Sequence, residues 1–297
     1  MIASEGGRES ISATLFSDAA CPWAYSAVPA LRVLEWRYGD QLAWRLVLVG
    51  LTEDASQYEE RGYTPLRVAR SRALFRRYGM PMSTEPRTRV AATGRACRAA
   101  VAARLHEPGS EWRVFRALQF ANFTTTLLLD DDADIARALR GVDGVEADAI
   151  VARLDDPAVE EAYTRDKEET RAAAGSAAEL QGKTATTDGP VRFTAPSLVL
   201  DRDGRRLVAG GFQPLDAYDV LVANLDPTLE RAPAPDDPAP LLERFPDGLV
   251  TQEVAALLVR GNEPADRAAA ELALLELVAE GRASRTAIGD DALWRAA

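Results

Sequence analysis

The first fifty residues carry the pattern that most constrains the fold: two short apolar segments with a helical segment between them. Ile11 to Phe16 alternates apolar with small polar side chains, which is typical of a strand. Cys21 to Tyr38 repeats apolar residues at helical spacing, and Leu42 to Val49 again has the pattern of a strand. If the two strands run parallel, these segments form a β-α-β unit, which commits the chain to an α/β architecture.

The predicted helix begins with a cysteine and a proline. Pro22 suits the first turn of a helix, where its missing N–H has no partner to lose. A helix N-terminus carries about half a positive charge, and cysteines placed there can have pKa values of about 3.5–7.5. We therefore expect Cys21 to be more acidic than a free thiol. A dithiol site would have a second cysteine at the fourth place of the motif, but this sequence has Ala24 there.

The rest of the chain divides into further segments. Residues 63–183 read as successive helices without a convincing strand, which predicts a helical insertion. Strands return after residue 184, as a hairpin around Asp-Gly, followed by a helix over Pro214 to Leu225. We expect residues 11–62 and 184–225 to form one domain around this insertion.

The remaining residues are predicted to form a separate unit. Residues 226–240 contain five prolines and no apolar period, which is typical of a linker. Residues 241–297 read as two amphipathic helices and two short strands around Gly-Asp-Asp, an order that suggests a winged-helix-like domain. Six arginines against ten Asp and Glu give this segment a net charge of −4, which argues against DNA binding. Packing on the preceding domain and homodimerisation are the two alternatives.

Composition excludes several classes of function. The net charge of −11 makes nucleic acid an unfavourable partner. The sequence has no run of about 18 apolar residues, which is the length that a membrane-spanning helix needs. The N-terminal residues also lack the apolar stretch of a secretion signal, so we expect a cytoplasmic protein. Two cysteines far apart and a single histidine match no metal-site spacing. We expect no metal and no cofactor beyond a low-molecular-weight thiol as co-substrate.

Three motifs together resemble a known family, the DsbA-like thioredoxin-fold proteins, and within it the FrnE and 2-hydroxychromene-2-carboxylate isomerase-like branch. The motifs are DAACPWAY around Cys21, FTAPSLVL with the proline that is cis in this family, and GGFQPLDAY before the last helix of the domain. The resemblance covers about residues 11–225 and departs from the family pattern at Ala24. It implies a thioredoxin-like fold with a large helical insertion, to which the winged-helix-like domain is an addition.

The resemblance also implies a set of site residues. Cys21 is the candidate catalytic thiol, and a cis bond at Pro196 would turn the backbone of Ala195 toward it. A peptide edge beside a thiol can hold an extended disulfide substrate or a small thiol. The candidate substrate-binding residues are Pro22, Trp23, Ala24, Thr194, Ala195 and Pro196.

Several interpretations of the function stay open. In the first, Cys21 alone attacks a disulfide of a small molecule or protein, and a second thiol releases the mixed disulfide. In the second, the chain is a redox-inactive scaffold that makes protein contacts. A third is a glutathione-type isomerase or transferase. Cys97, in an alanine-rich helix of the insertion, is either a core residue or a remote resolving thiol.

Overall fold

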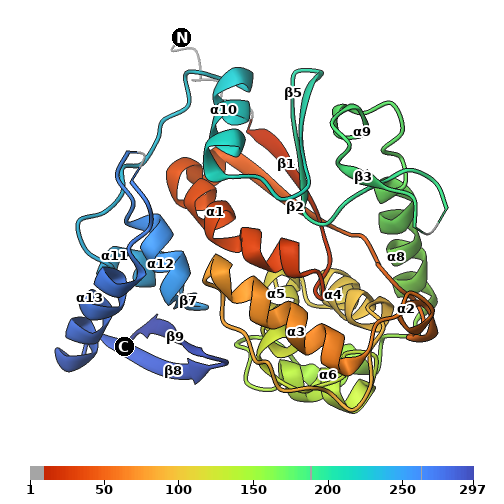
Figure 1. Cartoon of the computed structure of the whole chain (residues 1–297). Helices are drawn as coiled ribbons and strands as arrows, with labels where there is room; N and C mark the ends of the chain where they lie inside the picture. Colours follow the sequence, from red (N-terminus) through yellow and green to blue (C-terminus); the bar gives the residue numbers. More distant parts are fainter. Residues whose placement is uncertain (1–9, 188, 262) are drawn as a thin grey trace, which may run out of the picture.

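The computed structural model describes residues 10–187, 189–261 and 263–297 (Figure 1). Its central sheet has the order β2-β1-β5-β6. β1 and β2 are parallel, whereas β5 pairs antiparallel with both β1 and β6. The bounds of these strands are β1 Ile11–Ser17, β2 Leu42–Leu48, β5 Ser197–Arg202 and β6 Arg205–Gly210. The predicted β-α-β unit and the hairpin are therefore both present.

Two helices of the thioredoxin-like part lie side by side in Figure 1: α1 (Pro22–Tyr38) and α10 (Leu215–Leu225). α1 runs through Pro29 as one helix and ends at Gly39, where a short 3-10 turn (Gly39–Gln41) leads into β2. Side chains of β1, of α1 and of the insertion share one large core cluster, which includes Leu15 and Leu34. The sheet and the insertion thus fold around a common core.

The predicted insertion over residues 63–183 is helical in the structure. Its helices cover the lower and right-hand parts of the view in Figure 1. A second small sheet of two short antiparallel strands, which the sequence pattern did not indicate, precedes β5. The bounds are α2 Ser56–Glu60, α3 Pro65–Phe75, a 3-10 turn Arg76–Tyr78, α4 Gly94–His106, α5 Glu111–Thr124, α6 Asp132–Leu139, α7 Ala147–Val151, α8 Pro157–Thr170, α9 Ala177–Leu180, β3 Thr184–Ala185 and β4 Arg192–Phe193.

One predicted helix of the insertion is divided. The sequence pattern indicates a single helix over Pro157–Leu180, but α8 ends at Thr170 and α9 begins at Ala177. Gly175 lies between them with φ +76°, a left-handed conformation that a helix does not continue through. Ser176 then caps α9 by accepting a hydrogen bond from the backbone N–H of Glu179.

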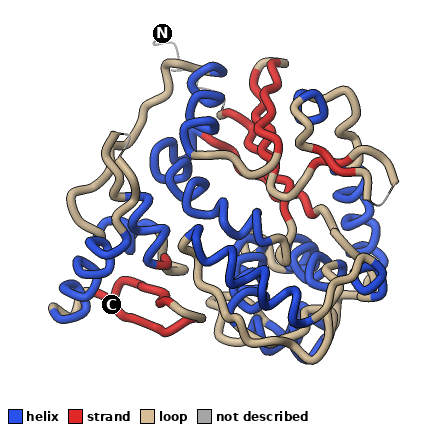
Figure 2. Tube along the Cα trace, viewed as in Figure 1, coloured by secondary structure: helices blue, strands red, loops and turns tan. Residues whose placement is uncertain are grey.

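The C-terminal residues form a further group of helices and strands, and Figure 2 shows its strands apart from the central sheet. The order is helix, strand, two helices and two strands, with a three-stranded sheet β7-β9-β8. Trp294 of this group is fully buried. The first helix and first strand were not predicted. The bounds are α11 Ala239–Arg244, β7 Leu249–Val250, α12 Thr251–Leu257, α13 Arg267–Ala279, β8 Ala283–Ile288 and β9 Asp291–Ala296.

The C-terminal group packs on the rest of the same chain. α12 contacts α1, and Val33 of α1 belongs to the C-terminal core cluster. The proline-rich segment before it is held along the end of α1, because Trp36 Nε1 donates to the carbonyl of Pro233 and Ala232 N donates to that of Arg37. Contact within one chain, one of the two alternatives drawn from the sequence, is therefore present in the structure, and homodimerisation stays a prediction.

Candidate active site around Cys21

Cys21 is the N-cap residue of α1. Its backbone is extended (φ −80°, ψ 115°), Pro22 follows in the first turn, and no acidic residue lies in that turn. The strand β1 ends four residues earlier, so the tight connection 18–21 sets the thiol at the edge of the sheet. The helix N-terminus expected from the sequence is present at this cysteine.

The thiol itself is closed in by the loop before β5. The Ala195–Pro196 peptide bond is cis, and Cys21 Sγ donates a hydrogen bond to the carbonyl of Ala195 at 3.0 Å. Cys21 and Ala195 are each only 6% exposed. The peptide edge beside the thiol is thus buried and occupied by the thiol, rather than open to an extended substrate.

Burial also overturns the expected acidity of Cys21. Removal from water raises the pKa of the thiol from its ordinary value of 9.0 to about 12. Hydrogen bonds from the backbone N–H groups of Ala24 and Trp23 act in the opposite direction but do not outweigh burial. The N-terminus of α1 lowers the pKa of the thiol, as the sequence predicted, but removal from water raises it by more.

No second thiol lies with Cys21 at the cavity: the fourth place of the motif is Ala24, and Cys97 is on another helix. Ala24 is 2% exposed and lies in the same small apolar cluster as Cys21. Cys97 is fully buried in α4, and its Sγ lies 3.7 Å from Asp18 Oδ2. Both cysteines are free thiols. Cys97 does not line the cavity that Cys21 borders, so a resolving role would require α4 or its neighbours to move.

Asp18 is a site residue that the sequence analysis missed. It is fully buried, and burial raises its pKa above the ordinary value. Its carboxyl group accepts hydrogen bonds from the backbone N–H of Ala20, from that of Leu51 and from Thr93 Oγ1, at 2.9 to 3.0 Å. It thereby joins the connection before Cys21 to the loop after β2 and to the start of α4. An acidic residue three positions before the cysteine was the only signal in the sequence.

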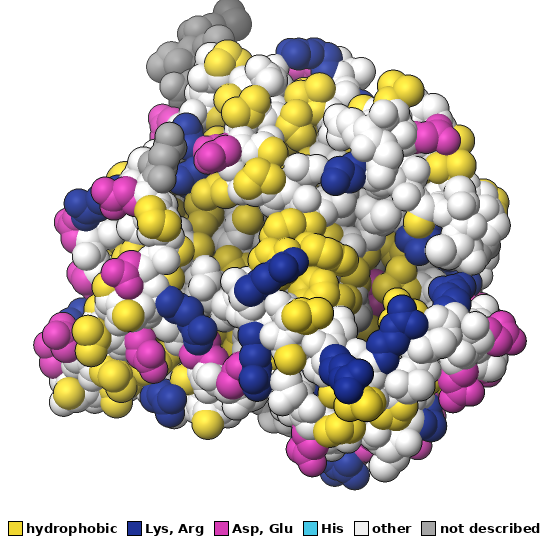
Figure 3. Space-filling model, viewed as in Figure 1, with side chains coloured by type: hydrophobic (Ala, Val, Ile, Leu, Met, Phe, Trp, Pro, Cys, Tyr) yellow, Lys and Arg dark blue, Asp and Glu magenta, His cyan; other side chains and the backbone are white. Residues whose placement is uncertain are grey.

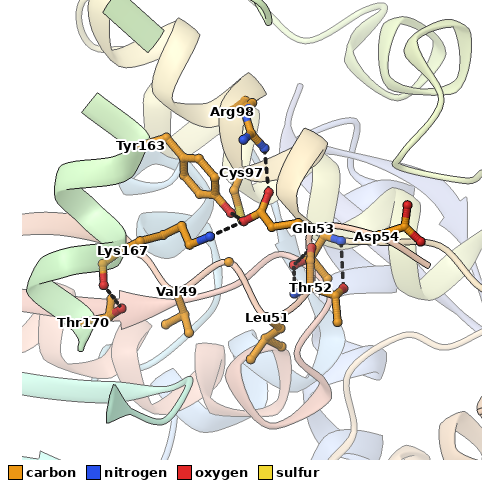
Figure 4. A network of polar contacts seen from close by, with 12 residues as sticks. Val49, Leu51, Thr52, Glu53, Asp54, Cys97, Arg98, Tyr163, Lys167 and Thr170 are labelled. Atoms are coloured by element: carbon orange, nitrogen blue, oxygen red, sulfur yellow. Dashed lines mark hydrogen bonds and ion pairs between the residues drawn. The ribbon is translucent and has the colours of Figure 1, made fainter. Parts of the chain in front are cut away.

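The loop after β2 is fixed from its other side by a polar network (Figure 4). The carboxylate of Glu53 accepts hydrogen bonds from Arg98, Tyr163 and Lys167, at 2.9, 2.7 and 2.5 Å. These partners lie on α4 and α8, and their side chains point toward Glu53. The network holds the residues that hydrogen bond to Asp18 against the insertion.

A cavity of about 440 Å³ opens beside Cys21, between α1, α3 and the loop 85–91, with Thr187 and Arg192 also in its wall. Cys21, Pro22 and Trp23 line its edge, whereas Ala24, Thr194, Ala195 and Pro196 do not. Figure 3 shows hydrophobic side chains gathered in the middle of this face, with Lys and Arg side chains over α3 and toward α2. The other lining residues are mostly apolar or aromatic, with several arginines and a few other polar side chains: Ala20, Leu51, Tyr58, Tyr63, Pro65, Val68, Ala69, Phe75, Val90, Ala91, Phe123, Arg61, Arg72, Arg87, Arg89, Arg192, Ser71, Glu85, Asn122 and Thr187.

Trp23 is the exposed member of the candidate site. It is 40% exposed, and its ring contacts Phe75 edge-on at 4.8 Å and Phe212 at 5.5 Å between centroids. Thr194 instead donates from Oγ1 to the carbonyl of Lys183, away from the cavity. The structure therefore brings Cys21, Pro22 and Trp23 together at the cavity and leaves Thr194 outside it.

Comparison with known proteins identifies the family. Residues 13–175 match the model of the DSBA-like thioredoxin domain, and the chain belongs to this family of thiol–disulfide oxidoreductases. No curated protein sequence matches the chain. None of the described helices is long and apolar enough to span a membrane, and no group of three or more His, Cys, Asp and Glu in the described residues could hold a metal ion.

Solved structures show the same fold at low sequence identity. A putative protein disulfide isomerase from Nitrosomonas europaea is 16% identical, with a TM-score of 0.54 over 73% of this chain and 97% of that chain. A probable DsbA oxidoreductase from Streptomyces coelicolor is 18% identical, with a TM-score of 0.53 over 73% and 91%. The cytosolic disulfide reductase DsbM from Pseudomonas aeruginosa is 18% identical, with a TM-score of 0.50 over 72% and 98%.

Proposed function

We propose that this protein is a thiol–disulfide oxidoreductase that works through Cys21 alone, on a small-molecule or protein disulfide, with a small thiol as co-substrate. The observation that carries the proposal is that Cys21, at the N-terminus of α1 and beside the cis Ala195–Pro196 bond, borders a cavity large enough for a small molecule. Membership in the DsbA-like family supports the class of chemistry.

The reaction needs two exchange steps. Cys21 loses its proton to solvent, and its thiolate attacks one sulfur of the substrate disulfide, so that the disulfide bond breaks and the other sulfur leaves as a thiolate. A small thiol, as its thiolate, then attacks the substrate sulfur of the mixed disulfide and releases Cys21. The net result is exchange of the substrate disulfide with the small thiol, and no other oxidant or reductant is required.

The first step is limited by the proton on Cys21. With a pKa of about 12, about one thiol in 10⁵ is ionised at pH 7. Reaction therefore requires the substrate to displace the hydrogen bond to Ala195, or the loop before β5 to open. This same observation favours a second candidate function, a redox-inactive scaffold in which the Cys21 thiol serves as a buried hydrogen-bond donor.

We also propose that the chain belongs with the FrnE and 2-hydroxychromene-2-carboxylate isomerase-like branch and that residues 241–297 are a winged-helix-like addition. The order helix, strand, two helices, two strands supports the second statement. The negative charge of that segment and its packing on α1 support a role in contacts within the protein rather than with nucleic acid. Two free thiols support a reducing compartment such as the cytoplasm.

The test is direct capture of the mixed disulfide. Cys97→Ala protein is incubated with bis(2-hydroxyethyl) disulfide at neutral and mildly alkaline pH, and the intact mass is measured, with Cys21→Ser as the matched control. We expect one hydroxyethylthio adduct that the control lacks and that added mercaptoethanol removes. If folded protein gains no adduct even at alkaline pH, the scaffold is the better description.

A further inference from the structure

We propose that the cavity beside Cys21 binds a small organic acid, with the carboxylate at Arg72 and Arg87 and its apolar body toward Cys21. The proposal names a ligand class for the function proposed above. Binding of the acid does not require any reaction at Cys21. Only a role of the bound acid in thiol chemistry rests on the proposed function.

The first observation is the environment of Arg72, on the inner side of α3. This residue is 3% exposed and lines the cavity. Its guanidinium donates to two backbone carbonyls, of Asn122 at 2.6 Å and of Ser83 at 3.4 Å, and its Nε has no partner among the described residues. All of these acceptors are neutral, so the positive charge is buried without a counter-charge.

Arg87 adds a second charge to the same place. It also lines the cavity, and its Nη2 donates to the same carbonyl of Asn122 at 2.8 Å and to the side-chain oxygen of Asn122 at 3.0 Å. Burial, with the like charge of Arg72 as the second cause, lowers the pKa of Arg87 to about 9. Two guanidinium groups thus meet at one carbonyl oxygen, where their charges repel.

No carboxylate in the described residues forms an ion pair with either group. Glu85 lines the cavity but pairs with neither. Arg89, also at the cavity, differs because its guanidinium pairs with both oxygens of Asp130. A buried charge without a partner is unfavourable by several kcal/mol in general. An anion in the cavity would relieve that cost, and guanidinium groups are well suited to carboxylates.

The walls select an acid with an apolar body over an inorganic anion. Besides the arginines and the thiol, the cavity is lined by Val68, Ala69, Phe75 and Phe123, with Trp23 at the edge. Its volume of about 440 Å³ falls within the usual range for small-molecule sites, about 300–1,000 Å³. Because the arginine pair and Cys21 line the same cavity, we expect one ligand to contact both.

The experiment is a titration of Cys21→Ser protein with trans-cinnamate, followed by Trp fluorescence and calorimetry. Cinnamamide is the uncharged probe of the same shape, and inorganic phosphate is the anion without an apolar body. We expect cinnamate to bind at least about tenfold more tightly than either, which corresponds to about 1.4 kcal/mol. Equal binding of cinnamate and cinnamamide, tighter binding of phosphate, or no binding of cinnamate at millimolar concentration would overturn the proposal.

Arginine variants locate the site. Arg87→Gln should weaken cinnamate binding by about tenfold or more, whereas Arg70→Gln, an exposed residue of the same helix α3, should leave it unchanged. Arg87 is only partly buried, so its variant keeps the buried Arg72 in place, and a thermal melt checks its folding. Unchanged binding in folded Arg87→Gln protein would contradict the assignment. Because the background lacks the Cys21 thiol, binding can succeed while the mixed-disulfide test fails, and the two proposals are judged separately.

Discussion

Two arginine clusters of this protein differ in whether a carboxylate neutralises them. Arg116 of α5 is buried against Glu253 of α12, with two hydrogen bonds of 2.7 Å to the two carboxylate oxygens, and Arg32 of α1 reaches the same carboxylate at 3.4 Å. Arg72 and Arg87 share only neutral oxygens. The Nε of Arg116 also lacks a partner, so the distinguishing feature is the carboxylate.

The presence or absence of a carboxylate indicates the role of each arginine cluster. Glu253 is fully buried, accepts a further hydrogen bond from Val250 N, and joins α1, α5 and α12. The charges of this cluster are neutralised within the chain, and its ion pairs hold the C-terminal group against the thioredoxin-like part. The pair beside the cavity hydrogen bonds only to neutral oxygens of Ser83 and Asn122 and has no carboxylate partner in the described residues. We therefore infer that its counter-charge comes from outside the chain.

The largest expected effect comes from removing the shared carboxylate. Glu253→Gln leaves Arg116 without a counter-charge, whereas Arg32 keeps its ion pair with Glu35. Breaking a buried ion pair in this way costs about 3–5 kcal/mol. Urea denaturation of the whole chain should show this loss. The matched control is Glu280→Gln, whose exposed pair with Arg282 should contribute less than about 1 kcal/mol. If Glu253→Gln lowers the free energy of unfolding as little as the control does, Glu253 does not stabilise its arginines, and the contrast between the two arginine clusters fails.

The same substitution has a pH signature. Burial alone would raise the pKa of Glu253, but Arg116 and Arg32 together with the backbone bond lower it below the ordinary value of 4.5. Its contribution to stability is therefore present above pH 4.5 and is lost as pH falls below that value. We expect the acid dependence of unfolding to be shallower in Glu253→Gln than in the unsubstituted protein.

A smaller effect is expected at the thiol, and it tests whether the arginines at the cavity govern Cys21. With a pKa of about 12, the rate of iodoacetamide alkylation in Cys97→Ala protein should rise about 100-fold from pH 7 to pH 9 without an inflection. Arg87→Gln should leave this profile unchanged, because burial sets the pKa. An inflection below about pH 8 would restore the expectation drawn from the helix N-terminus.

The smallest effect should follow from removing an unpaired arginine. Arg72→Met loses two hydrogen bonds to carbonyls but also removes a buried charge, and Arg87 still donates to Asn122. We expect the free energy of unfolding to change by no more than about 1.5 kcal/mol, measured by the same urea denaturation. A loss as large as that of Glu253→Gln would show that Arg72 has a structural partner after all.

Much of the fold was predictable because its elements are strongly patterned. β1, α1 and β2 follow from their apolar periods, and the same kind of pattern indicates a helix over Asp132–Leu139, which are the observed bounds of α6. The small elements were not, because two-residue strands such as β3 and β7 carry no readable period. The break between α8 and α9 was missed because the apolar pattern continues across Gly175.

The candidate site was less predictable. Cys21 and Trp23 were identified from a motif at one helix start, where local chemistry is visible in the sequence. Arg72 and Arg87 lie about 50 and 66 residues further along the chain, and nothing local distinguishes them among 33 arginines. What marks them is that neither forms an ion pair with a carboxylate of the described residues, which only the folded chain determines. Burial of Cys21 likewise depends on the loop around Ala195, far away in the sequence.

The alanine at position 24 affects how long a mixed disulfide at Cys21 would last. In a dithiol enzyme the neighbouring sulfur ends a mixed disulfide by a first-order step, at a rate the protein sets for itself. Here the fourth place holds a buried methyl group and the other cysteine is enclosed in α4. In the mechanism we propose, a group bound to Cys21 would leave by collision with a second molecule. Its residence time would then scale inversely with the concentration of thiol in the surroundings, and the fraction of protein carrying such a group would record that concentration.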